Sequence, residues 1–108
     1  MFTSATADAE PLLTTLSALL ARELGKPEEY VMVAFEPRAR MSFGGTSAPA
    51  CYAELKNVGH LDAARVASLS ETLCSALAGG LGVAKDRIYI EFTNADGAYW
   101  GWNGETFG

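Results

Sequence analysis

A few residues of this chain carry side chains that can do chemistry, but their spacing matches no common metal or nucleophile motif. His60 is the only histidine, and the two cysteines, Cys51 and Cys74, form no C-x-x-C pair. A lone histidine without neighbouring cysteines or an acidic cluster is a poor metal site, and distant cysteines indicate neither zinc binding nor redox chemistry. Taken alone, Lys26 is a solvated charge after a helix, and the cysteines are small buried residues.

Composition narrows the classes of protein to consider. The chain has 108 residues, 49% of them hydrophobic, and a formal net charge of −5. We expect a single domain over residues 1–108. The acidic balance argues against nucleic acid and anionic membranes as partners. No apolar run approaches the roughly 20 residues that span a bilayer, and residues 1–10 do not form a signal peptide, so we expect a cytoplasmic protein.

Two leucine-rich stripes predict helices at Glu10–Leu24 and Ala63–Ala78, since their apolar residues recur at three- and four-residue steps. Asp8 and Asp62 are suited to cap their N-termini. The pair Gly79-Gly80, followed by Gly82, predicts the end of the second helix.

Alternating apolar residues predict three strands, at Tyr30–Phe35, Cys51–Leu55 and Asp86–Thr93. Residues 36–49 contain two prolines and Gly44-Gly45, which predicts an ordered loop. The aromatic, glycine-rich tail from Tyr99 to Phe107 predicts a hairpin or short edge strands.

An internal repeat connects these elements. Leu20–Phe35 and Leu77–Phe92 match at five positions, with an offset of 57 residues, as expected for two copies of a helix–turn–strand unit. The strand at Cys51–Leu55 precedes the second helix, and the same offset places its counterpart mostly before Met1. We therefore predict an α+β, β-α-β-β-α-β duplicated unit with a four-stranded mixed sheet, two helices on one face, and a first strand that is truncated or missing.

The two faces of the predicted strands differ. Val31, Val33 and Phe35 should face the helices. On the opposite side, Tyr30, Met32 and Ala34 are too apolar for an open solvated face, which predicts an oligomer. The third strand presents Tyr89, Glu91 and Thr93 on that side.

Four blocks in the right order resemble one known family, and together with the segments between them they cover nearly the whole chain from Leu12 on. G-K-P-E-E-Y-V-M-V (25–33) is similar to the family's segment after its first helix, and M-S-F-G-G-T-S-A-P (41–49) to its central loop. D-R-I-Y-I-E-F (86–92) and G-W-N-G-E-T-F (101–107) resemble its last strand and tail. The chain is identified as a macrophage migration inhibitory factor homologue of the tautomerase superfamily, closest to the bacterial and cyanobacterial type.

The resemblance implies a homotrimer with sites between neighbouring subunits and with no metal or organic cofactor. It implies keto–enol tautomerisation of phenylpyruvate-like 2-oxo acids, and often of dopachrome. The general base is the amine of an N-terminal proline, whose pKa is lowered toward neutrality by apolar burial and nearby cations. A cation holds the substrate carboxylate, and an aromatic wall suits a phenyl group.

By the resemblance, Lys26 of G-K-P corresponds to the substrate-binding lysine, and Val58 to a residue whose backbone contacts substrate. Tyr89 corresponds to a tyrosine supplied by the next subunit. The pocket aromatics correspond to Tyr30, Trp102 and Phe107.

The chain departs from the family pattern at three places. It begins Met1-Phe2, where the family has Met-Pro and an apolar strand, so the proline base is absent from the chain as written. Glu91 stands where animal members have asparagine, and its charge disfavours an anionic substrate unless neutralised. Ala50 and Ala53 replace the family's C-x-x-C cysteines.

Three interpretations follow from the sequence. The first is a tautomerase whose written N-terminus is incomplete. The second is a catalytically impaired trimeric binding or signalling module of the same fold. The third is an unrelated acidic α+β enzyme with Lys26 or His60 as the base.

Overall fold

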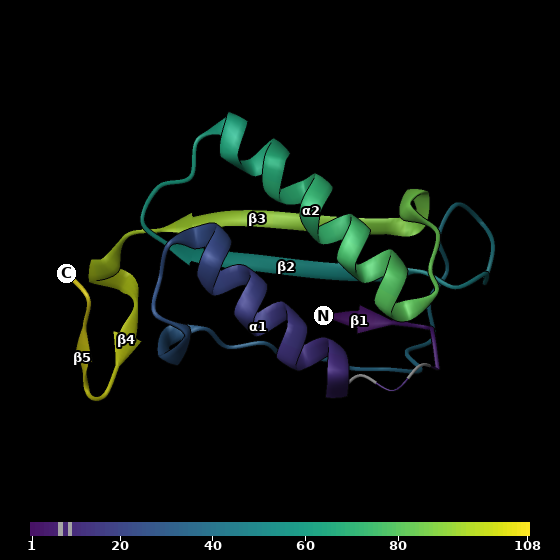
Figure 1. Ribbon diagram of the computed structural model, residues 1–108, viewed down its shortest axis with the longest axis horizontal. Helices are drawn as coiled ribbons and strands as arrows, with labels where there is room; N and C mark the ends of the chain where they lie inside the picture. Colours follow the sequence, from purple (N-terminus) through teal and green to yellow (C-terminus); the bar gives the residue numbers. More distant parts are fainter. Residues whose placement is uncertain (7, 9) are drawn as a thin grey trace.

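The computed structural model describes residues 1–6, 8 and 10–108, and places two helices across one face of a sheet (Figure 1). The helices are α1 (Glu10–Leu24) and α2 (Ala63–Leu81). The sheet contains β1 (Phe2–Thr3), β2 (Cys51–Val58) and β3 (Ile88–Ala95). The predicted α+β class, with both helices on one face, is confirmed.

The strands lie in the order β1-β2-β3, with β2 in the centre. β2 and β3 are parallel and pair over eight residues, from Cys51 opposite Ile88 to Val58 opposite Ala95. β1 is antiparallel to β2 and pairs only at Phe2–Tyr52 and Thr3–Cys51. The first strand is therefore short, as predicted.

The first helix has the predicted bounds. Its N-terminal amide at Glu10 donates to the Asp8 carboxylate at 3.2 Å, and Gly25 follows its end with a φ of 64°. Such a left-handed φ suits glycine and turns the chain out of the helix. The helix therefore begins and ends where local sequence signals place it.

The second helix is longer than predicted, because Gly79 and Gly80 lie inside it and Gly82, at φ 68°, ends it. The Asp62 cap is confirmed, since its carboxylate accepts the Arg65 amide at 2.8 Å. A Cβ on Gly80 would lie 2.7 Å from a methyl carbon of Leu12 in α1. Glycine at that position thus allows the two helices to approach closely, and does not end the helix.

The strand predicted at Tyr30–Phe35 is wrong. Glu28–Tyr30 form a 3₁₀ turn, and residues 31–35 lie outside the hydrogen-bonded ladders. The first residue beyond them, Glu36, forms only an isolated parallel bridge to Phe2. A strand needs a paired neighbour, and β1 offers only two residues. The predicted alternation of side chains still holds, since Val33 and Phe35 pack on the core while Met32 is 91% exposed.

The remaining boundaries shift by a few residues. β2 continues beyond Leu55 to Val58, and a 3₁₀ turn at Lys85–Arg87 precedes β3. The predicted tail hairpin is present as β4 (Gly101–Trp102) and β5 (Glu105–Thr106), after a 3₁₀ turn at Gly97–Tyr99.

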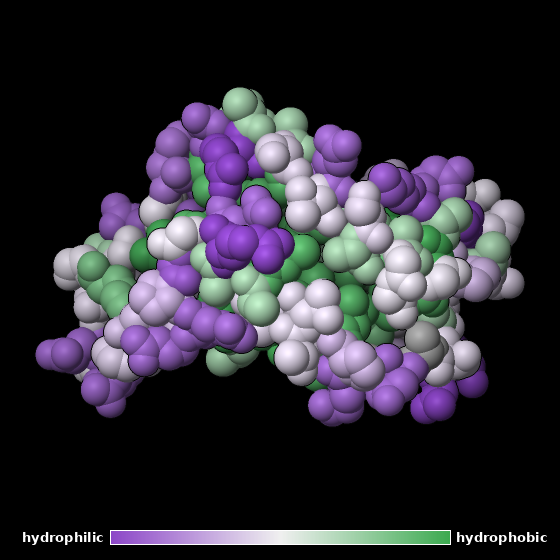
Figure 2. Space-filling view, viewed as in Figure 1, coloured by the Kyte–Doolittle hydropathy of each residue, from purple (hydrophilic) through white to green (hydrophobic). Residues whose placement is uncertain are grey.

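The core lies between the helices and the sheet. Leucines of both helices pack there against the helix-facing side chains of β2 and β3. On the helix side, apolar residues show between the helices, and the most hydrophilic residues gather left of centre over the helices and along the lower edge (Figure 2). In the part of the chain that is described, no helix is long and apolar enough to cross a membrane.

Arg87 fixes the loop that precedes β2. Its guanidinium donates to the carbonyl oxygens of Pro49 at 3.0 Å, Ala48 at 3.1 Å and Phe43 at 3.2 Å. It also lies 5.2 Å from the centre of the Phe43 ring, within cation–π range. The predicted ordered loop is thus tied to the start of β3 by one side chain.

Cys51 should be unreactive in the folded protein. It is fully buried, and burial raises the pKa of its thiol to about 11. Since the thiolate is the reactive form, a Cys74→Ala variant should react with a thiol reagent at pH 8 only as fast as it unfolds. Labelling monitored by absorbance, with and without denaturant, checks this, and equal rates in the two conditions would contradict it.

Candidate functional site

Lys26 lies just after α1 and reaches the end of β2. Its amide donates to the Ala21 carbonyl at 3.0 Å, which holds the residue on the last turn of the helix. Its ammonium donates to the Val58 carbonyl at 2.7 Å, in a partly buried contact. The structure therefore brings together two residues that the sequence analysis singled out from positions 32 residues apart.

The Val58 carbonyl is available because of its place in the sheet. Successive residues of a strand direct their main-chain groups to opposite edges, and Tyr52 is paired with β1. By this alternation the main-chain groups of Val58 point to the same edge of β2 as those of Tyr52. β1 pairs with that edge only at Cys51 and Tyr52, so it leaves the Val58 carbonyl without a partner from β1. Lys26 supplies the missing donor, so this contact closes the end of that edge.

Three of the predicted aromatic residues form one cluster, called here the aromatic cluster: Tyr30, Trp102 and Phe107. The Tyr30 ring meets Trp102 edge-on at 5.6 Å and Phe107 edge-on at 6.0 Å, measured between ring centres. Trp102 and Phe107 stack at 5.7 Å. Such edge-to-face and stacked geometries are favourable for aromatic pairs. The tail hairpin is thus attached to the segment that begins at Lys26.

Tyr89 lies away from this group. It packs against Phe43 at 4.7 Å between ring centres and is 64% exposed. It is opposite Tyr52, six positions from the Val58–Ala95 pair, or about 20 Å along the strand. Within one chain Tyr89 therefore lies far from Lys26.

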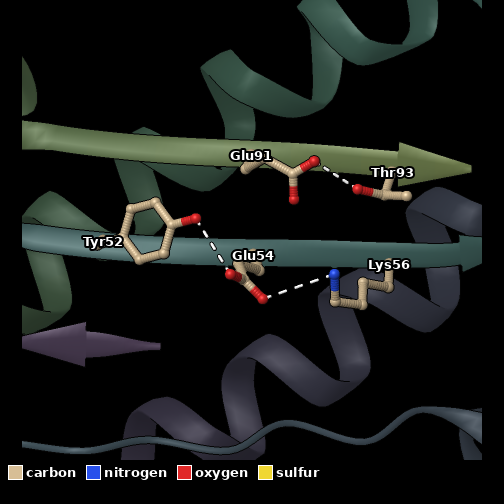
Figure 3. A network of polar contacts seen from close by, with 5 residues as sticks. All are labelled: Tyr52, Glu54, Lys56, Glu91 and Thr93. Carbon is tan, nitrogen blue, oxygen red and sulfur yellow. Dashed lines mark hydrogen bonds and ion pairs between the residues drawn. The ribbon is translucent and has the colours of Figure 1, made fainter.

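The outer face of the sheet carries a polar network, of which the sequence analysis named Glu91 and Thr93 but not Tyr52, Glu54 or Lys56 (Figure 3). The Tyr52 hydroxyl donates to Glu54 at 3.1 Å, and Lys56 pairs with the same carboxylate at 3.6 Å. The hydrogen bond to Glu54 raises the pKa of the exposed Tyr52 phenol. Beside it, Thr93 donates to Glu91. The period-two alternation of Tyr52, Glu54 and Lys56 was the signal that could have revealed this network.

The N-terminal amine is at the far end of the same edge. The Met1 ammonium donates to the Ala34 carbonyl at 3.2 Å. Since Phe2 is opposite Tyr52, Met1 is opposite Ala53, five positions from Val58 and about 16 Å away along the strand. The Met1 amine therefore does not lie beside Lys26.

His60 was the alternative to Lys26 as the base of an unrelated α+β enzyme. It lies after the end of β2 and is exposed. Across the described residues, no three side chains among His, Cys, Asp and Glu come together as a metal would require.

Trp102 should hold the tail in place. A Trp102→Ala change removes one stacked and one edge-on contact, so the C-terminal segment should become several-fold more sensitive to limited proteolysis. Tyr99→Ala is the matched control, since Tyr99 is also aromatic and in the tail but 88% exposed. Mass spectrometry of the digests checks this, and equal cleavage of both variants would contradict it.

Comparison with known proteins gives one consistent result. The family model described as Macrophage migration inhibitory factor (MIF) matches residues 4–108. The chain is 39% identical to macrophage migration inhibitory factor of Meriones unguiculatus over 98 aligned residues. The alignment covers 91% of this chain and 85% of that protein. The chain is 40% identical over 95 residues to the Trichuris trichiura homolog, covering 88% and 83%.

Solved structures agree with this result. The macrophage migration inhibitory factor homologue from Prochlorococcus marinus superposes with a TM-score of 0.93 at 46% identity, covering 99% of this chain and 96% of that one. The Trichinella spiralis protein gives a TM-score of 0.93 at 36% identity, covering 98% and 96%.

Proposed function

Since the chain belongs to the macrophage migration inhibitory factor family and has its tautomerase fold, we propose that it is a keto–enol tautomerase acting on phenylpyruvate-like 2-oxo acids, with dopachrome as a further substrate. Family membership supports an isomerase of the tautomerase kind. The observation that carries the finer proposal is the contact between the Lys26 ammonium and the Val58 carbonyl.

That contact orients a cation for an anionic ligand. An ammonium has three N–H donors, and Val58 accepts from one of them at 2.7 Å. The other two are available for a substrate carboxylate, in charge-assisted hydrogen bonds that strengthen where water is partly excluded. Lys26 would therefore bind the carboxylate of a 2-oxo acid.

The aromatic cluster supplies the second half of recognition. Tyr30 is four residues beyond Lys26, and it holds Trp102 and Phe107 of the tail beside it. Flat apolar rings near a cation match a ligand with a phenyl group at one end and a carboxylate at the other. Phenylpyruvate has both features.

Keto–enol exchange itself needs a base. A proton leaves the carbon beside the ketone and is returned to the oxygen, so the base both accepts and donates it. In the family that the chain resembles, the base is a proline amine. The Met1 amine of this chain lies about 16 Å from Val58, measured along β2. The alternative function is a catalytically impaired trimeric binding or signalling module of the same fold.

Binding of phenylpyruvate should depend on Lys26. Lys26→Ala removes charge-assisted hydrogen bonds, so we expect the Kd in calorimetry to rise about tenfold or more. Lys56→Ala is the matched control, because it deletes the same charge on the outer face of the sheet, where Lys56 pairs with Glu54. Equal effects of the two changes would remove Lys26 from the site.

Turnover then separates the two functions. Tautomerisation of phenylpyruvate above the buffer rate, followed by absorbance, supports the enzyme, while saturable binding without turnover supports the binding module. Absence of both would overturn the ligand class.

Proteins of this fold are oligomeric, and we propose a homotrimer in which Tyr89 of one subunit completes the site of the next. Within one chain Tyr89 lies about 20 Å from Val58 along the strand, so it is too far from Lys26 and Val58 to join the site of its own subunit. This separation supports the arrangement.

A mixing experiment tests the shared site. Lys26→Ala and Tyr89→Ala chains should each bind phenylpyruvate weakly, but oligomers refolded from both should regain some sites with unaltered residues, and hence some tight binding. Calorimetry on the mixture measures the recovery, and light scattering gives the number of subunits. No recovery in a mixed oligomer, or a monomer at micromolar concentration, would contradict the proposal.

A further inference from the structure

The turn that follows β2 is bonded to a side chain at the end of β3. The Asn94 side-chain oxygen accepts the Leu61 amide at 2.9 Å, and the Asn94 side-chain nitrogen donates to the Leu61 carbonyl at 3.1 Å. This pair of hydrogen bonds, called here the Asn94 clamp, needs a group that donates and accepts at once, as a carboxamide does. Asn57, opposite Asn94 in the ladder, does not add to it: it is 5% exposed, and its side-chain oxygen has no hydrogen-bond partner among the described residues.

The Asn94 clamp lies three residues beyond the carbonyl that binds Lys26. The Val58 carbonyl and the Gly59 N–H belong to one planar peptide unit and point in opposite directions. The Gly59 N–H donates to the Ala95 carbonyl at 2.9 Å, and the Val58 oxygen accepts from Lys26 at the other edge of β2. The orientation of this peptide unit therefore decides where the Lys26 ammonium is held.

Gly59 makes that peptide unit easy to rotate. Its φ of 123° is one that other residues rarely adopt, and glycine rotates with little steric restriction. The bond from Gly59 to Ala95 also follows the last pair of the parallel ladder, where the ends of strands open most readily. The Asn94 clamp supplies an anchor beyond Gly59, and the Leu61 side chain strengthens it by packing on the core.

We infer that Asn94 is a positioning residue of the ligand site. Asn94 holds Leu61, and this restricts rotation of the peptide unit at Gly59. The Val58 carbonyl is thereby kept directed at Lys26, whose remaining N–H groups bind the substrate carboxylate. The inference rests on the proposed function, because it gives Asn94 a part in binding the same 2-oxo acid.

The binding test compares two variants that each lose hydrogen bonds at this turn. Asn94→Ala loses the clamp, so its Kd for phenylpyruvate in calorimetry should rise about fivefold. Asp62→Ala is the matched control, because it loses a bond one residue beyond Leu61, from the Arg65 amide at 2.8 Å, and keeps the clamp. Its Kd should stay within about twofold of that of the unaltered chain. An equal rise in both variants would overturn the inference.

A double-mutant cycle separates positioning from a general structural effect. In a Lys26→Ala chain, the further change Asn94→Ala should alter the Kd by no more than about twofold, since the ammonium that Asn94 positions is gone. A structural role would weaken binding by the same factor in both backgrounds. Independent, additive effects of the two changes would therefore overturn the inference.

A third measurement uses the free protein, so it does not depend on whether phenylpyruvate binds. A hydrogen bond at a carbonyl oxygen deshields the carbonyl carbon, so the ¹³C signal of the Val58 carbonyl should move upfield in Lys26→Ala. It should move the same way, by a smaller amount, in Asn94→Ala, and exchange of the Gly59 amide should become several-fold faster. An unmoved Val58 signal with unchanged Gly59 exchange would overturn the inference. If both changes occur but the unaltered chain does not bind phenylpyruvate, the proposed function fails and the positioning of Lys26 by Asn94 stands.

Discussion

The parallel pairing of β2 with β3 is the constraint on which the rest of the structure depends. Eight residues of each strand pair in unbroken register, and the same strands present their apolar faces to both helices. Parallel strands require a crossover, and α2 provides it on the side where α1 also lies. The register also decides that Val58 and Ala95 end together, which places the tail hairpin near the segment containing Lys26 and Tyr30.

The two edges of β2 have very different surroundings. One edge is fully paired with β3, while the other is paired with β1 at only two residues. The same asymmetry explains why a lysine ammonium bonds a strand carbonyl and why residues 31–35 are extended without a ladder. β1 and Lys26 bond to this edge at different places, since β1 pairs with Cys51 and Tyr52 while Lys26 bonds to Val58.

Local signals in the sequence were sufficient where a feature depends on neighbouring residues. The bounds of α1 and the Asp62 cap of α2 followed from periodicity and capping residues. The C-terminus of α2 could not be predicted from its own residues. A glycine such as Gly80 is typical of a helix end, but here glycine is required because Leu12 of α1 packs against it. The strand at 30–35 failed for a similar reason, since its alternation was right but its pairing depends on another segment.

The candidate site shows the same division. Lys26, Val58 and the aromatic cluster were predicted from the resemblance, and the structure brings Lys26 to Val58 and gathers the three aromatic residues. The open acceptor of Asn57 could not be predicted, because it arises from burial. No single element contains the candidate site: the segment after α1 supplies the lysine, β2 the carbonyl, and the tail the stacked rings. The Lys26–Val58 bond and the contact of Tyr30 with Trp102 therefore join three separate segments, and a ligand that engages the cation and the rings together would stabilise all three.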